Sequence, residues 1–305
     1  MLNLFKKTCS PVWLFHKPGM IWLSQFLDNG NLIIEHRTGS RRATFSERKV
    51  SFLLLDALTG QPLWENFMLK DDAGNAIGDG WWVGLELVYE NLFYLHSYVA
   101  PHIPEHRGLW AFDATSARLV WKHESVSFVS RSGGELLVYR PADSEALAER
   151  RYFILDALTG ETLRAVSTAE AHAFRNQSKD LATAQGVTLP TRHDETSPDF
   201  ERIQSLAEKA TSAKNIVAGY DCLELGTTTL LGYHEQTEKT VLTPNGLPVK
   251  ALTYKLFVLK EGKPIYHDTL GEAMSGWLVD GFFVRKNRLY YTKHQDTLVA
   301  LDLPA

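Results

Sequence analysis

Short apolar runs, each ended by an aspartate and a polar turn, recur along the chain and predict a fold built from β-hairpins. The clearest copies are residues 52–64 (FLLLDALTGQPLW), 109–121 (LWAFDATSARLVW) and 152–164 (YFILDALTGETLR). An aspartate at this position accepts hydrogen bonds from backbone N–H groups of the turn, and a following glycine adopts the positive φ that closes it. A weaker copy lies at 256–266 and a partial copy ends the sequence at 297–303, so the pattern predicts five repeats.

A second pair of short strands precedes each hairpin. These pairs are expected at 20–37, 82–98, 127–140, 220–234 and 278–293, each with polar or glycine turn residues inside it. Each repeat therefore holds about four strands in about 40–50 residues, which is the size of a propeller blade. The chain is predicted to be all-β and to form a five-bladed β-propeller.

The predicted blades belong to a single domain over 1–305. They cover residues 20–68, 80–124, 126–166, 217–268 and 276–303. The last blade lacks its fourth strand, and the strand-like segment 11–16 has no partner in the first blade. We expect 11–16 to complete the last blade and to close the ring, because closure removes exposed strand edges.

Residues 167–216 interrupt the strand pattern and predict a helical insertion between the third and fourth blades. Ser197 is the expected N-cap of its clearest helix, with Pro198 at the first helical position. Apolar residues follow at helical spacing: Phe200, Ile203, Leu206, Ala207 and Ala210. Such a face usually packs on a core, so we expect it to cover the propeller; a lid or partner-binding element over one mouth of the ring is the alternative. The polar stretch 188–198 is expected to be a mobile loop between the helices of the insertion.

One repeat carries a recognisable motif. The pattern Asp-x-x-Thr-Gly-x-x-x-Trp, complete from Asp56 to Trp64, resembles the repeat of the PQQ-type quinoprotein β-propellers, within the wider group of WD40- and YVTN-like propellers. The resemblance implies a propeller fold, and that superfamily includes non-enzymatic outer-membrane assembly scaffolds. The other copies depart from the pattern at Ser116-Ala117, Arg164, Lys260 and Tyr266. In the enzymes of the superfamily an adjacent cysteine pair and a calcium site hold the quinone, whereas Cys9 and Cys222 are far apart here, so we expect no cofactor.

Composition and charge exclude several classes of protein. The 305 residues are 44% hydrophobic and 22% charged, with a formal net charge of −4. This argues against wholesale disorder and against a nucleic-acid binder with a broad basic face. No window approaches the ~20 apolar residues that span a bilayer. The apolar stretch 12–15 after Lys6 and Lys7 is also shorter than the about 7–15 residues of a secretory signal, so a cytoplasmic protein is expected.

Two histidines match a zinc-peptidase motif by spacing. Residues 102–106 read His-x-x-Glu-His, which binds zinc when both imidazoles lie on one face of a helix, one turn apart. Pro101 and Pro104 disfavour a helix here, so a solvated loop is expected and no catalytic metal is assigned. His102 and His106 remain candidates for adventitious metal binding.

The expected inner strands of the blades carry carboxylates that could serve carbohydrate chemistry. The candidates are Asp28, Asp79, Glu86, Asp221 and Asp280. In some five-bladed glycoside hydrolases and lyases, two channel carboxylates about 5–9 Å apart act as the acid and as the nucleophile or base. The other interpretation, which we favour, is that these residues cap turns or are solvated in the channel.

Tryptophans point to a binding surface. Trp22, Trp110 and Trp277 are in or next to strands and are expected in the core between blades. Trp81 and Trp82 are adjacent, so alternation along a strand should leave one of them exposed or lining the channel. The sequence therefore favours a non-catalytic scaffold or binding protein, whose protein, small-molecule or carbohydrate ligand lies at the propeller mouth. The alternative is a carbohydrate-active hydrolase or lyase that uses the channel carboxylates.

Overall fold

The chain folds into antiparallel sheets, which confirms the predicted all-β class. The computed structural model describes residues 9–39, 47–101, 103–140, 150–178, 180–211 and 213–304. Within these residues there are five sheets. The chain divides into two compact units, which we call unit 1 (Met1–Lys17 with Gly186–Ala305) and unit 2 (Pro18–Gln185).

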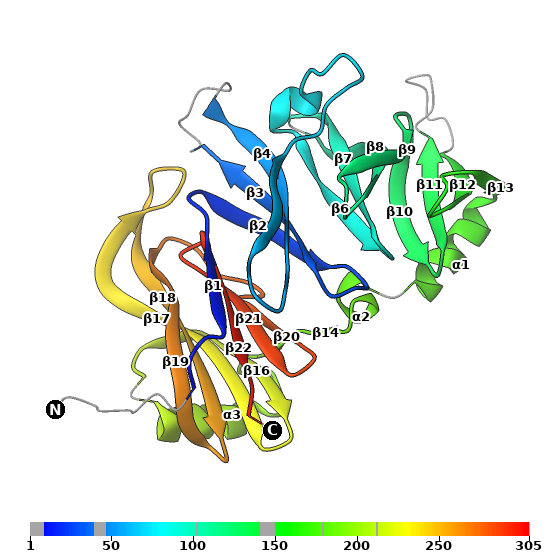
Figure 1. Ribbon diagram of the computed structural model, residues 1–305. Helices are drawn as coiled ribbons and strands as arrows, with labels where there is room; N and C mark the ends of the chain where they lie inside the picture. Colours follow the sequence, from blue (N-terminus) through cyan, green and yellow to red (C-terminus); the bar gives the residue numbers. More distant parts are fainter. Residues whose placement is uncertain are drawn as a thin grey trace. The chain divides into compact units, whose positions relative to one another are not determined.

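Unit 2 contains three four-stranded sheets, and in each the strands pair in chain order (Figure 1). The first sheet contains β2 (Met20–Phe26), β3 (Leu32–Thr38), β4 (Lys49–Leu55) and β5 (Pro62–Phe67). The second contains β6 (Val83–Tyr89), β7 (Leu92–Ala100), β8 (Ile103–Asp113) and β9 (Arg118–His123). The third contains β10 (Ser127–Ser132), β11 (Glu135–Arg140), β12 (Arg151–Asp156) and β13 (Thr162–Val166). The 3₁₀-helix η2 (Ile77–Gly80) precedes β6, and helices α1 (Thr168–Gln177) and α2 (Leu181–Ala184) follow β13.

Unit 1 contains the other two sheets and one helix, α3 (Phe200–Ala210). The fourth sheet runs in the order β15 (Thr191–His193), β16 (Ile216–Leu225), β17 (Thr228–Leu242), β18 (Pro248–Lys260) and β19 (Lys263–Met274). The fifth runs in the order β1 (Trp13–His16), β22 (Thr297–Asp302), β21 (Arg288–Lys293), β20 (Phe282–Arg285) and β14 (Val187–Thr188).

The N-terminal strand β1 pairs with the last strand of the chain. Trp13 lies opposite Ala300 and His16 lies opposite Thr297, in antiparallel register. Trp13 is buried whereas Leu14 is exposed, as the alternation of a strand requires. The predicted pairing of 11–16 with the closing segment is therefore confirmed.

The aspartate turns form as the sequence predicts. Asp56 Oδ1 accepts the backbone N–H groups of Leu58 at 2.7 Å and Thr59 at 3.1 Å. Gly60 closes this turn with φ +70°. In the copy that lacks glycine, Ala117 holds the corresponding position with φ +53°. The turn is thus kept at the cost of a conformation that alanine disfavours.

The repeat tryptophans join consecutive sheets of unit 2. Trp64 Nε1 donates to the carbonyl of Ala114 at 2.7 Å, and Trp121 Nε1 donates to the carbonyl of Ala157 at 3.0 Å. Both acceptors belong to the aspartate turn of the following sheet, so the motif bonds each sheet to the next. Where Arg164 replaces the tryptophan, helix α1 covers the third sheet through a buried apolar cluster.

In unit 1, a tyrosine takes over this bridging role. Tyr266 stands where the repeat would have a tryptophan, on β19 of the fourth sheet. Its hydroxyl lies 2.6 Å from the hydroxyl of Tyr291 on β21 of the fifth sheet. Tyr291 in turn donates to the carboxylate of Asp268 at 2.6 Å. Between these two sheets, a hydrogen bond between tyrosine hydroxyls therefore takes the place of the hydrogen bond that a tryptophan N–H makes in unit 2.

The insertion is helical, but its details differ from the prediction. Helix α3 begins at Phe200, and Ser197 and Pro198 lie in the turn before it. Ile203 and Ala207 are fully buried against strands β16 and β17. The interpretation of the apolar face as core-covering is confirmed. The stretch 188–198, expected to be a mobile loop, instead contains β15 and the end of β14, because its backbone pairs with the edges of two sheets.

Two tryptophans expected in the core are exposed instead. Trp22 is 59% exposed and Trp277 is 54% exposed, whereas Trp110 is buried as expected. Trp22 is the extra residue of a β-bulge between Ile21 and Leu23, and such a bulge redirects its side chain. Trp277 precedes β20 and lies outside the strands. Among the described residues, no helix is long and apolar enough to cross a membrane.

Candidate functional site

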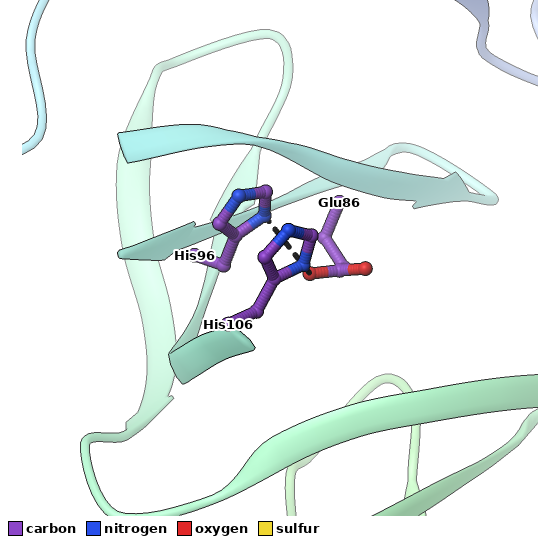
Figure 2. A group of neighbouring side chains, drawn as sticks. All are labelled: Glu86, His96 and His106. Atoms are coloured by element: carbon purple, nitrogen blue, oxygen red, sulfur yellow. Dashed lines mark hydrogen bonds and ion pairs between the residues drawn. The ribbon is translucent and has the colours of Figure 1, made fainter. Parts of the chain in front are cut away.

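Three neighbouring strands of the second sheet bring Glu86, His96 and His106 together, and we call this group the His–Glu cluster (Figure 2). Glu86 lies on β6, His96 on β7 and His106 on β8. The Nδ1 atoms of His96 and His106 lie 2.9 and 2.8 Å from the same oxygen, Oε2 of Glu86. Two imidazoles therefore share one carboxylate oxygen.

A β-bulge directs Glu86 into the cluster. Leu85 pairs with Leu95 and Leu87 pairs with Tyr94, so Glu86 is the extra residue on β6. A bulge disrupts the regular alternation of side chains and is common next to functional sites. His96 pairs with Gly84, His106 pairs with Tyr98, and the residues on both sides of Glu86 pair with β7, so the sheet holds the three strands in place around the cluster.

The cluster is buried on one side and open on the other. His96 is 4% exposed, whereas the side chain of His106 is 33% exposed. The two rings stack with their centroids 3.5 Å apart and their planes 8° apart (Figure 2). Tyr98 contacts both rings edge-on, with centroid distances of 5.2 and 5.1 Å. A ligand from solvent would therefore meet His106 first.

Glu86 carries a negative charge at neutral pH. Burial raises the pKa of this carboxyl group, but contacts with the imidazoles of His106 and His96 outweigh burial and bring the pKa to about 2. The group is therefore an anionic acceptor, and it cannot donate a proton near neutral pH. The arrangement is suited to holding a cation or hydrogen-bond donors.

Gly84 leaves a small space beside the buried face of His96. Gly84 pairs with His96, and a Cβ on Gly84 would lie 2.9 Å from His96 Nε2 and 3.2 Å from Glu35 Oε2. Glu35 is itself held in place: its Oε1 pairs with Arg37 at 2.6 Å and its Oε2 accepts the N–H of Leu85 at 2.8 Å. Neither nitrogen of His96 makes an aligned hydrogen bond to the residues that the structure describes.

The carboxylates selected from the sequence fall into two groups. Glu86 and Asp221 lie on strands and are largely buried, each with its own partners. Asp221 pairs with Arg192 at 2.9 Å and accepts the hydroxyl of Tyr254 at 2.7 Å. The remaining three are exposed and lie outside the strands: Asp28, Asp79 and Asp280. Their predicted position on inner strands is wrong, because the chain turns at each of them.

Trp81 and Trp82 do not alternate as strand residues. Both lie in the turn between η2 and β6, and both are half-buried. Trp81 packs against the core below the guanidinium of Arg37, which lies 5.1 Å from the ring centroid. Trp82 contacts the ring of Tyr98, with centroids 6.1 Å apart, and so lies next to the residues that flank the His–Glu cluster.

The histidine motif is extended, not helical. His106 lies in β8, which corrects the expectation of a solvated loop, and the helix needed by the zinc-peptidase motif is absent from 103–113. His102 lies outside the described residues. The partner of His106 is His96, which the sequence analysis did not select. In the hairpin of β7 and β8, His106 lies opposite Tyr98, and His96 lies two residues before Tyr98 on β7, so only the observed register brings the two imidazoles together.

Comparison with known proteins adds little about activity. Residues 27–121 match a family described as a domain of unknown function (DUF4905). No curated protein matches the chain.

Solved structures are similar to the chain over most of its length. A DUF4221 family member from Bacteroides vulgatus is 8% identical with a TM-score of 0.38, over 96% of this chain and 97% of that chain. A glycosyl hydrolase from Bacteroides ovatus is 12% identical with a TM-score of 0.32, over 99% and 92%. The Dos1 propeller is 11% identical with a TM-score of 0.30, over 92% and 68%.

Proposed function

We propose that the chain is a five-bladed β-propeller of the PQQ-like type, closed by the pairing of β1 with β22, and that it acts as a non-catalytic binding protein. The five sheets, the hydrogen bonds from Trp64 and Trp121 to the next sheet, and the terminal pairing support this architecture. Each of these features is expected when similar sheets follow one another around a ring.

The observation that carries the binding role is the ionised carboxylate of Glu86 between two imidazoles, with His106 open to solvent. An anionic acceptor in such a place attracts a cation or a ligand with several hydrogen-bond donors. Tyr98 and Trp82 line the approach with aromatic surface. The ligand is therefore a small cation or a polar molecule that carries hydroxyl or ammonium groups.

The hydrolase alternative has less support. A glycosidase needs one carboxylic acid that donates a proton, and such a group has a raised pKa. The pKa of Glu86 is lowered to about 2, so it cannot fill this role. Glu35, the nearby buried carboxylate, has both oxygens engaged by Arg37 and by the Leu85 N–H. Neither of the two described carboxylates near the His–Glu cluster, Glu86 and Glu35, is therefore available to donate a proton to a substrate.

A ligand panel tests the binding role. The melting temperature of the protein is measured with divalent metal chlorides, polyamines, and mono- and disaccharides, for the wild type, His106→Ala and the matched control His172→Ala. His172 is an exposed histidine on α1. We expect at least one ligand class to raise the melting temperature of the wild type and the control but not of His106→Ala.

The hydrolase alternative is tested on the same proteins with chromogenic aryl glycosides. We expect no release of the chromophore above the blank. Turnover that is lost in Glu86→Gln would replace the binding role by a catalytic one. A ligand that stabilises His106→Ala as much as the wild type would show that binding occurs elsewhere.

A further inference from the structure

We propose that the His–Glu cluster is a binding site for a divalent transition-metal ion of the zinc class, held by His96 Nδ1, His106 Nδ1 and a carboxylate oxygen of Glu86. The inference rests on the proposed binding role and names the class of its ligand. Sequence spacing alone did not assign this site, because its three donors come from three strands.

The donor set selects the class of metal. Two imidazole nitrogens and one carboxylate oxygen suit Zn²⁺, Co²⁺, Ni²⁺ or Fe²⁺. Mg²⁺ and Ca²⁺ prefer oxygen ligands throughout and are disfavoured here. Three protein ligands also leave at least one coordination position open on the exposed side of His106.

The distances place the donors close to a coordination sphere. The three donor atoms lie within 4.8 Å of one another. Glu86 Oε2 lies 2.9 and 2.8 Å from the Nδ1 atoms of His96 and His106, so the three donors already face one another. With bonds of about 2.0–2.1 Å in a tetrahedral arrangement the donors would lie about 3.3 Å apart, so the carboxylate oxygen must move slightly away from both nitrogens to admit the ion.

Coordination also requires one ring to turn. The imidazole planes are parallel within 8°, so a single ion cannot lie in both planes at once. His96 is packed in the interior, whereas His106 is a third exposed and its ring can rotate about its Cβ–Cγ bond. We therefore assign His96 and Glu86 as the fixed part of the site and His106 as the ligand that closes on the ion.

The environment of His96 favours a metal over a purely hydrogen-bonded network. This ring is nine-tenths or more buried, yet neither nitrogen makes an aligned hydrogen bond to the described residues. A buried nitrogen without an aligned hydrogen bond is costly, and an ion coordinated at Nδ1 would supply an aligned partner there. Ligation at Nδ1 places the proton of His96 on Nε2, which faces the space over Gly84.

Titration of the chelator-treated full chain with ZnCl₂ tests the proposal by calorimetry, with CoCl₂ as a spectroscopic probe of tetrahedral nitrogen–oxygen ligation. We expect one Zn²⁺ per chain and no measurable heat with MgCl₂ or CaCl₂. His106→Ala and Glu86→Gln should weaken binding by at least about tenfold. His172→Ala should bind as the wild type does, and a Cys9→Ser background removes the half-buried thiol as an alternative donor.

Melting temperatures without metal show whether each variant is folded, and His106→Ala is the least disruptive because that side chain is partly exposed. Equal zinc affinity in the wild type and His106→Ala overturns the site. If zinc does not bind while an organic ligand still depends on His106, the metal inference fails and the binding role stands. If no ligand of any class depends on His106, both fail.

Discussion

Gly84 matters to the His–Glu cluster because it has no side chain. A Cβ at this position would lie 2.8 Å from a ring carbon of His96 and 2.9 Å from its Nε2. Gly84→Ala must therefore displace the imidazole, since the carboxylate of Glu35 closes the other side. We expect a loss of about 1–3 kcal/mol in the free energy of unfolding and weaker binding at the His–Glu cluster.

Urea unfolding and zinc titration measure the two effects of Gly84→Ala. Gly276→Ala is the matched control, because a Cβ on Gly276 meets nothing within 4 Å. Equal stability and equal binding in both variants would show that the space over Gly84 is not needed.

His234 provides a pH-dependent contribution to stability. It is fully buried in β17, and its Nε2 accepts the N–H of Leu278 at 2.9 Å. Burial, with a smaller effect of the Arg192 charge, lowers its pKa from 6.5 to about 4. Between these values the unfolded chain binds a proton that the folded chain does not. Stability is therefore fully present above pH 6.5 and decreases as the pH falls towards 4, by up to about 3 kcal/mol.

Unfolding by urea at pH 7.5, 6 and 5 measures this loss. In His234→Gln the amide oxygen can still accept the Leu278 N–H but does not titrate, so the decrease should largely disappear. The lowered pKa of Glu86 acts in a separate window, from 4.5 down to about 2, and does not mask the effect. An unchanged pH dependence in His234→Gln would assign the loss to other groups.

The turn after Asp113 is strained at one residue. Ala117 adopts φ +53° where the two other copies of the turn have glycine, at Gly60 and Gly160. Ala117→Gly should therefore stabilise the protein by about 0.5–1 kcal/mol, because glycine adopts this conformation freely. Gly160→Ala should destabilise it, since a Cβ there would also lie 2.6 Å from the ring of Trp121.

Denaturant unfolding measures the change in the free energy of unfolding for each variant. If the turn geometry is as described, this change is positive for Ala117→Gly and negative for Gly160→Ala. A destabilised Ala117→Gly would mean that the entropy of the unfolded chain outweighs the relief of strain.

The strands and hairpins were predictable because their signals are local. The apolar run before Asp56 and the turn residues after it define strand, turn and strand within a few positions. The short strands β14 and β15 were not predictable, because only the edges of distant partner strands make them extended. Trp22 and Glu86 are both bulge residues, and a bulge depends on the register of two strands.

The candidate site was predictable only in pieces. Glu86 was selected as a carboxylate and His106 as a metal-binding residue, but for separate reasons. Their convergence with His96 follows from the pairing of three strands, in which β7 continues to Ala100 and β8 begins at Ile103. A solvated loop was expected around His106. Without the pairing of β7 with β8, nothing in the sequence shows that two histidines face one carboxylate.

At the scale of the whole molecule, the first and last described strands, β1 and β22, pair with each other. Trp13 is 7% exposed in β1, whereas its neighbour Leu14 is 61% exposed. Trp13→Ala should lower the free energy of unfolding by about 3 kcal/mol, and Leu14→Ala should change it little. Hydrogen exchange of the β22 amides should accelerate in Trp13→Ala, since β22 loses its partner at that edge.

Trp13→Ala also tests the proposed closure of the ring. In a closed propeller every sheet supports its neighbours, so loosening β1 should also speed amide exchange in the first sheet, which belongs to unit 2. Leu14→Ala serves as the control for nonspecific effects of a substitution in β1. If faster exchange in Trp13→Ala stays confined to the fourth and fifth sheets, the terminal pairing completes one sheet without closing a ring, and the proposed five-bladed architecture must be abandoned.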